Sequence, residues 1–306
     1  MKVIVSRYGS IFGKSIANNK TSKFHPPMVR GLGIFYAIIL IISHLYNGSL
    51  FGFVEIVIIT LSTLIGFWDD KYNLSYKYKL LYFLALGVVF SFLTTSFSSE
   101  DLYLVYTLIS KIFLFIFLIL FFNQIDGING LATGTFCTCL VFLTLINIDL
   151  TLCVPVIATI LAYLGINFRG NIGIQGDSGS FFMGSYIAVL YSKSLMPFEY
   201  GLVLFILTPI FFDISSTTII RFCSQIDLSK GHRNNLYQKL TYKLKNHVLV
   251  TCLFVFFQLV LCFTLAFLMN KFVLMEVYAV FGLISILLLP LFLFISYLIQ
   301  NNKIFK

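Results

Sequence analysis

Long apolar runs recur along the whole chain, separated by short stretches of polar and charged residues. A transmembrane α-helix needs about 20 mainly apolar residues, and a soluble core does not call for so many runs of that length. The pattern therefore predicts an all-α fold, a polytopic transmembrane helical bundle of about ten spans. We expect these spans near residues 32–47, 50–68, 80–97, 102–122, 131–148, 150–168, 181–196, 201–220, 248–269 and 277–299.

Composition and charge support this prediction and orient the bundle. The chain is 59% hydrophobic and 11% charged, whereas globular proteins average about 45–50% apolar and about 25% charged residues. Of its 21 Lys and Arg residues, all but Lys111, Lys193 and Lys271 fall on the face that would hold both termini. The positive-inside rule makes this face cytoplasmic. Because the basic residues are sorted by side and not gathered in one soluble domain, the partner they indicate is the lipid bilayer and not nucleic acid.

The same pattern divides the chain into three segments. A basic cytoplasmic or interfacial segment covers 1–31, a transmembrane domain with a cytoplasmic loop at 221–247 covers 32–299, and a cytoplasmic tail covers 300–306. Basic and apolar residues interleave over 1–18, which predicts an amphipathic segment lying on anionic lipid. In Asn19–Gly33, two prolines, Arg30 and two glycines precede the first span. This stretch either caps the start of the first helix or places Arg30 against a phosphate, and the sequence leaves both roles open.

Adjacent carboxylates follow the second span, where Asp69 and Asp70 precede Lys71, and Lys77 and Lys79 open the next span. A solvated loop is the simpler reading of such a cluster. However, paired carboxylates at a membrane exit suit metal ligation or proton abstraction, and nearby lysines suit phosphates.

A second acid lies in the stretch from Asn123 to Leu131, where Asp126 and Asn129 are three residues apart and share a helix face. An Asx-turn joining two spans is the alternative. It does not explain why Asn, Asp and Asn recur at a period of three where the chain re-enters the membrane, so we favour a functional role.

The tetrad Gly176-Asp177-Ser178-Gly179 lies between two long apolar runs. An acid at such a depth is costly unless it faces a partner or a water-filled cavity. The glycines allow the backbone to approach a ligand closely, and they precede a helix whose first N–H groups favour an anion. A carboxylate at this point indicates a phosphate held through a divalent metal.

Two further features remain ambiguous. Asp213 lies within a span and is a functional candidate by default, although a pair with Lys111 or a helix–helix hydrogen bond would also explain it. His232-Arg233 lies in the longest polar loop, which either rests on acidic lipid headgroups or recognises an anion. Four motifs are expected on one face with Arg30, and there several acids and bases can hold magnesium and a diphosphate together. These motifs are Asp69/Asp70, Asp126, Asp177 and His232-Arg233.

In order and spacing, the motifs from Asn19 to Leu240 resemble those of the polyprenyl-phosphate N-acetylhexosamine-1-phosphate transferases. NNKTSKFHPPMVRGLG is similar to the family's N-x-R-S-S-H…P-R-G-G-G, and GFWDDKYNLSYKYKL to its G-x-x-D-D-x-x-x-L-x-x-x-x-K-L. NQIDGINGLATG resembles N-x-x-D-G-x-D-G-L, and GIQGDSGSFFMG resembles F-M-G-D-x-G-S-x-x-x-G. HRNNLYQKL is similar to the H-R-x-H-x-Y-Q-R-L of the O-antigen-initiating branch, which favours that branch over the distantly related phospho-MurNAc-pentapeptide transferases.

The resemblance implies an enzyme of the bacterial inner membrane. It would transfer a sugar-1-phosphate from a UDP-N-acetyl amino sugar (GlcNAc, QuiNAc or FucNAc) to polyprenyl (undecaprenyl) phosphate, release UMP and initiate cell-envelope glycan synthesis. Mg²⁺, or Mn²⁺ in its place, is the implied cofactor, and a homodimer is left open. The rival class is a cation-coupled transporter, whose acids would lie near the bilayer midplane, often in inverted repeats. Here the acids cluster at one surface and no repeat is visible, which favours the enzyme.

The resemblance also implies roles for individual residues. The implied catalytic residues are Asp69 and Asp70 near the lipid phosphate, one of them the proton acceptor, together with Asp126, Asp177 and His232. Asp177 would be the chief metal ligand and Asp126 a second acid around the metal or the diphosphate. The implied substrate-binding residues are Arg30, Lys79, Asn123, Asn129, Asn167 and Arg233, with Asn129 and Asn167 lining the uridine pocket.

Departures from the family pattern set further expectations. Asn129 stands where the family usually has Asp, Asn235 replaces a His, and Leu32 replaces a Gly. Only eighteen residues precede Asn19, where the family has a first span. We therefore expect ten spans with both termini cytoplasmic, or else a start codon placed too far downstream.

Overall fold

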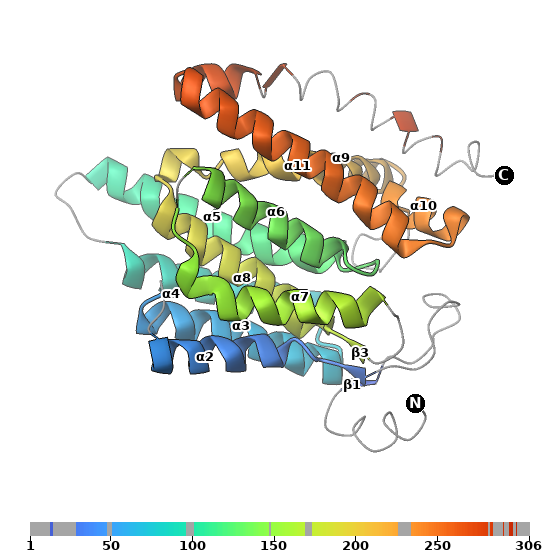
Figure 1. The fold of residues 1–306 in the computed structure, drawn as a ribbon, viewed down its shortest axis with the longest axis horizontal. Coiled ribbons are helices and arrows are strands. Elements are labelled where there is room, and N and C mark those ends of the chain that lie inside the picture. The colour runs from blue at the N-terminus through green and yellow to red at the C-terminus, as the bar shows by residue number, and fades with distance from the viewer. Residues whose placement is uncertain are drawn as a thin grey trace. The chain divides into compact units, whose positions relative to one another are not determined.

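The computed structural model describes residues 13–14, 29–47, 51–95, 101–146, 148–168, 173–225 and 234–280, and isolated positions between 282 and 298 (Figure 1). The chain divides into two compact units. The first contains residues 1–133 and 149–200, and the second contains 134–148 and 201–306. We describe each unit by itself.

The first unit is built around α8 (Gly176–Ser194), whose residues from 178 to 191 are all buried. Its main neighbours are α3 (Phe53–Tyr72) and α5 (Asp101–Ile125). Glycines allow these helices to approach closely, since a Cβ on Gly66 of α3 would lie 2.5 Å from the Asp177 carbonyl oxygen, and one on Gly184 of α8 would lie 2.5 Å from the Cα of Ile119. The remaining helices are α2 (Ile34–Asn47), α4 (Tyr76–Thr94), α7 (Val154–Phe168) and the short 3₁₀ helices η1 (Thr151–Cys153) and η2 (Pro197–Glu199).

A small sheet of two-residue strands joins distant segments of the first unit. Strand β2 (Val29–Arg30) pairs antiparallel with β1 (Gly13–Lys14) and parallel with β3 (Gly173–Ile174). The prediction of an all-α fold did not include this sheet. It also places Gly13–Lys14 in a strand, where we expected a flat interfacial segment, while the rest of 1–18 lies outside the described residues. Its consequence for the site is that Arg30 lies beside the segment that leads into α8.

The second unit contains most of α6 (Leu131–Leu145), together with α9 (Leu202–Cys223), α10 (Leu236–Leu244) and α11 (His247–Lys271). α11 packs against α9 and α10. It also contacts α6, where the Thr135 hydroxyl donates to Gln258 Oε1 at 3.1 Å and the Cys262 thiol donates to the Thr138 carbonyl oxygen at 3.4 Å. These bonds satisfy polar groups inside an otherwise apolar helix packing.

Four of the described helical segments are long and apolar enough to cross a membrane: Tyr76–Thr94, Leu102–Ile125, Pro197–Cys223 and His247–Lys271. Ile34–Tyr46, Leu131–Leu145 and Val154–Leu164 are apolar but shorter. These helices confirm the prediction of a helical, multi-pass membrane protein. The count of ten spans and the sidedness stay predictions, and the last expected span, 277–299, lies largely outside the described residues.

Candidate active site

The end of α3 supplies the first two acids of the site. Asn73, at φ 52°, ends the helix, and its N–H donates to the Asp69 carbonyl oxygen at 2.8 Å. The Asp69 carboxylate accepts from the Leu74 N–H at 2.7 Å and from the Lys79 ammonium at 2.8 Å. Both of its oxygens are therefore held by the turn into α4 and by the first helical turn that follows it.

The neighbouring acid, Asp70, caps the start of α8. Its carboxylate accepts from the Asp177 N–H at 3.0 Å and from the Ser178 N–H at 3.1 Å. Gly176 makes this approach possible, because its φ is +70° and a Cβ there would lie 2.3 Å from Asp70 Oδ2. The first N–H groups of a helix carry partial positive charge, which the fully buried Asp70 side chain neutralises.

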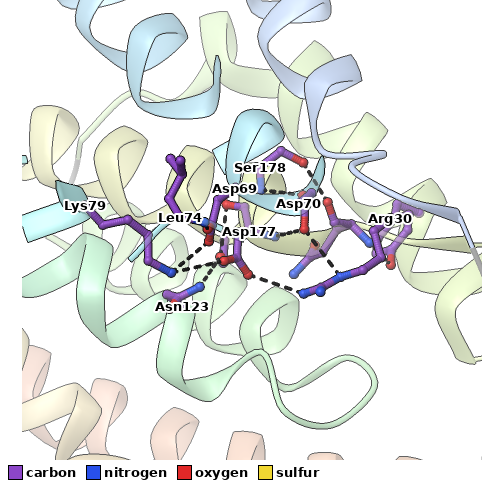
Figure 2. Close-up of polar contacts among 11 residues, drawn as sticks. Arg30, Asp69, Asp70, Leu74, Lys79, Asn123, Asp177 and Ser178 are labelled. Atoms are coloured by element: carbon purple, nitrogen blue, oxygen red, sulfur yellow. Dashed lines mark hydrogen bonds and ion pairs between the residues drawn. The ribbon is translucent and has the colours of Figure 1, made fainter. Parts of the chain in front are cut away.

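Two cations join the acids of α3 to Asp177 (Figure 2). The Arg30 guanidinium lies 3.4 Å from Asp70 Oδ1 and 3.6 Å from Asp177 Oδ1. The Lys79 ammonium lies 2.8 Å from Asp69 Oδ2 and 3.7 Å from Asp177 Oδ2. The Asp177 side chain is thus flanked by a cation on each side, and at 19% exposure it is more open to solvent than Asp69 or Asp70. It is the acid best placed to meet a ligand.

Asp126 belongs to the same site through a residue that we did not single out from the sequence. Gln175 is 2% exposed, and its Nε2 donates to Asp126 Oδ1 at 2.9 Å. The Tyr36 hydroxyl donates to Gln175 Oε1, and the Gln175 N–H donates to the Tyr163 hydroxyl. The sequence did contain a sign of this role. Gln175 is a polar residue at the position where the family motif F-M-G-D has an apolar methionine.

The acids are close enough to affect one another's ionisation. Asp69 and Asp177 lie against the same Lys79 ammonium, at 2.8 Å and 3.7 Å. Burial, the bond to Asp69 and the charge of Asp70 raise the pKa of Asp177 well above its usual value. Burial works against ionisation of Asp69 as well, but its bonds to Asp177 and Lys79 hold the pKa of Asp69 below its usual value. Burial raises the pKa of Asp126 to about 7, although the hydrogen bond from Gln175 opposes this rise.

The Asp69–Asp177 pair fits a hard divalent cation. Within the described ranges, no group of three His, Cys, Asp or Glu side chains forms a ready-made metal cage. Mg²⁺ at phosphoryl-transfer sites is usually held by one or two carboxylates, with water and substrate phosphates completing the shell. Two neighbouring carboxylates, with Arg30 on one side of Asp177 and Lys79 between Asp177 and Asp69, match this donor set. Asp126, the other predicted ligand, is engaged by Gln175.

The remaining predicted residues are placed as follows. Asn123 Nδ2 donates to the Ser180 hydroxyl at 3.3 Å, so it lies beside the first turns of α8, and Asn129 is half-buried in the turn before α6. The structure describes the backbone of Asn167 at the end of α7 but not its side chain. His232 and Arg233 lie outside the described residues. In the second unit, Asp213 accepts from the Leu236 N–H at 2.7 Å and the Tyr237 N–H at 3.1 Å.

Comparison with known proteins agrees with the motifs and the site. Residues 52–194 match the family described as Glycosyl transferase family 4, and this range includes Asp69, Asp70, Asp126 and Asp177. Over 260 residues, the chain is 27% identical to the "Probable undecaprenyl-phosphate N-acetylglucosaminyl 1-phosphate transferase" of Bacillus subtilis (strain 168), and the match covers 78% of this chain and 72% of the relative. Both findings confirm the resemblance to the polyprenyl-phosphate sugar-1-phosphate transferases.

Proposed function

We propose that this chain transfers a sugar-1-phosphate from a UDP-N-acetyl amino sugar to polyprenyl phosphate and releases UMP at the cytoplasmic face of the inner membrane. The observation that carries the proposal is the position of Asp177, between Arg30 and Lys79 and beside Asp69, which pairs with the same lysine. The name of the Bacillus relative supports undecaprenyl phosphate as the acceptor and GlcNAc as the first donor to test. The loop motif HRNNLYQKL supports the deoxy-amino sugars QuiNAc and FucNAc as the next donors.

The proposed step exchanges one phosphorus–oxygen bond for another. An oxygen of polyprenyl phosphate attacks the sugar-bearing phosphorus of the UDP-sugar. The bond from that phosphorus to the oxygen shared with the uridine phosphate breaks, and UMP leaves with that oxygen. Attack and departure need to be roughly in line, so much of catalysis lies in positioning and charge neutralisation.

The described residues supply these two functions. Asp177 and Asp69 would hold a magnesium or manganese ion, which when bound neutralises the diphosphate and polarises the bond that breaks. Arg30 and Lys79 lie on either side of this pair, where they can contact phosphate oxygens once a ligand separates them from the acids. Asp126, held by Gln175, adds negative charge on the Arg30 side of the site.

Asp70 has a different role in this proposal, that of a positioning residue. Its carboxylate is fully buried and is occupied by two N–H groups of α8 and by Arg30. With three partners, Asp70 is the acid of the cluster least available to attack phosphorus. In the proposed step the lipid phosphate itself is the attacking group.

A donor panel tests the proposal. Purified protein in detergent would receive undecaprenyl phosphate, Mg²⁺ and, in turn, the UDP derivatives of GlcNAc, QuiNAc, FucNAc and MurNAc-pentapeptide, with UMP release and lipid-linked sugar measured together. We expect equal amounts of UMP and lipid product with an N-acetyl amino sugar donor, and loss of both in the presence of a chelator. Folded protein that forms no lipid product from any donor, or that is indifferent to chelation, would contradict the proposal.

A further inference from the structure

A second polar site lies at the other end of the first unit. A cleft of about 260 Å³ opens between the end of α4, the start of α5, the end of α8 and η2. One of its lining residues, Lys193, pairs with Glu55 at 3.0 Å. Glu55 lies near the start of α3 and Asp69 near its end, so the two residues are about 21 Å apart along the helix. The cleft is therefore separate from the acid cluster.

A buried cation that forms no ion pair with the described residues lines this cleft. Lys111 is 7% exposed, and its ammonium donates to the Thr94 carbonyl oxygen at 3.0 Å and to the Thr94 hydroxyl at 3.2 Å. In the part of the chain that the structure describes, no carboxylate lies within 4.0 Å of the Lys111 ammonium. A buried charge is costly unless it is paired. Glu55 pairs with Lys193, and its charge also acts on Lys111. Two lysines therefore share this one carboxylate, and the cleft keeps one net positive charge.

Two hydroxyl groups in the same cleft also lack partners. The Oγ1 atoms of Thr95 and Thr107 are shielded from solvent and form no hydrogen bond with any described residue. Thr107 as a whole is 7% exposed. Buried hydroxyl groups are normally bonded, so unpaired ones beside an unpaired ammonium indicate a ligand with several acceptor oxygens.

We propose that this cleft binds the phosphate group of an anionic ligand. A phosphate offers oxygens to the Lys111 ammonium and to the threonine hydroxyls at the same time, and it adds the negative charge that Glu55 alone cannot supply to two lysines. Its source is either a phospholipid headgroup or free phosphate. Tyr103 and Met196 line the cleft and are exposed, which gives a lipid chain an apolar surface to follow. The site shares no residue with the proposed transferase centre.

A thermal-shift titration of the full-length protein in neutral detergent tests this proposal. The probes are phosphatidylglycerol, uncharged diacylglycerol as the lipid control, and inorganic phosphate against chloride at equal ionic strength. We expect phosphatidylglycerol, but not diacylglycerol, to raise the melting temperature in a saturable way, and Lys111→Met to weaken this binding about tenfold. The matched control is Lys271→Met, which removes an exposed lysine at the end of α11 and is expected to leave binding unchanged.

A second variant keeps the test informative if Lys111→Met folds poorly. Thr107→Val has nearly the same shape and removes an unpaired hydroxyl, so the ligand-free protein is expected to be no less stable, while lipid binding weakens about threefold. Protection by inorganic phosphate that depends on Lys111 would identify free phosphate as the source. If neither probe protects the protein, or if both variants bind phosphatidylglycerol as the unaltered protein does, the proposal is wrong.

Discussion

The starts of α8 and α10 are built in the same way. Neither helix is capped by the side chain of its own N-cap residue, which is Gln175 in one and Asn235 in the other. Instead, each receives a carboxylate from another helix. Asp70 of α3 accepts two N–H bonds from α8, and Asp213 of α9 accepts two from α10. In both units, a buried acid thus replaces a local cap and fixes how a helix begins.

The two starts differ in the charges around the capping acid. Asp70 lies 3.4 Å from the Arg30 guanidinium and next to the Asp69–Asp177 pair. Among the residues that the structure describes, Asp213 forms no ion pair, and its carboxylate accepts from two backbone N–H groups. The same capping arrangement is therefore joined by further acids and cations in one unit, whereas among the described residues of the other unit it joins two helices. An acid buried within the helices is functional by default in a membrane protein, but only its neighbours show which role it has.

The largest effect that separates the two regions is expected from Asp177→Asn, because α10 has no counterpart of this acid. Without the carboxylate, the site loses the group that we propose holds the metal against the diphosphate, and turnover should fall about a thousandfold or more. The measurement is UMP release at saturating donor, with the elution profile and melting temperature as controls for folding. Near-normal turnover in a folded variant would remove Asp177 from the metal site.

The next largest effect is expected from Asp70→Asn, which is a direct test of the first helix start. An amide cannot replace both acceptor oxygens, so one N–H of α8 loses its partner, which costs about 1–3 kcal/mol. Arg30 also loses its charge partner beside Asp177. We expect a lower melting temperature together with a fall of about a hundredfold in turnover, larger than the change in UDP-sugar binding. A loss of stability with unchanged turnover would make Asp70 equivalent to Asp213.

Lys79→Met is expected to reduce turnover about tenfold to a hundredfold while leaving the fold intact. Lys79 lies 2.8 Å from Asp69 and 3.7 Å from Asp177, and its side chain is 18% exposed, so its charge reaches the open side of the cluster. Lys77→Met, two residues earlier in the same helix, removes an exposed lysine and serves as the matched control. Equal losses in the two variants would indicate a general charge effect instead of a specific contact.

Asp213→Asn should have the opposite profile to Asp70→Asn. One of the two N–H groups at the start of α10 loses its acceptor, which again costs about 1–3 kcal/mol in stability. No described cation or acid loses a charge partner. We expect a clear fall in melting temperature and a change of only a few-fold in kcat for the folded fraction. A loss of about a hundredfold in kcat at unchanged stability would overturn the comparison and place Asp213 among the reacting groups.

The sequence predicted the acids of the first unit because each lies in a motif next to an apolar run. Asp69 and Asp70 lie in the last turn of α3, Asp126 directly follows α5, and Asp177 lies in the first turn of α8. Helix ends on one face of a bundle are brought together by the fold itself. Their neighbours were less predictable. We expected Asp177 and Asp126 to form the metal pair, which stays a prediction. The structure adds Asp69 as a neighbour of Asp177, because α3 packs closely on α8 and Lys79 contacts both acids.

The small sheet and the capping bonds could not be predicted, for a physical reason. Strands of two residues, such as Val29–Arg30 and Gly173–Ile174, show no alternation that a pattern can detect. The bond between Asp213 and the start of α10 joins residues 23 positions apart, and neither residue type signals such a cap by itself. These long-range contacts depend on tertiary packing, which periodicity does not encode.

The smallest effect is expected at the N-cap residues themselves, where the two helix starts differ again. Gln175 donates to Asp126, whereas Asn235 donates to the Tyr237 hydroxyl within its own helix turn. Gln175→Met removes the bond to Asp126 but keeps a side chain of similar length. Because the family motif has methionine at this position, we expect the fold to tolerate the change, with a loss of activity of a few-fold.

Gln175→Glu is the contrasting variant, since it places a second acid against Asp126 and should lower turnover further. If Gln175→Met lowers activity as much as Asp126→Asn does, then Gln175 is essential for positioning Asp126 in this chain.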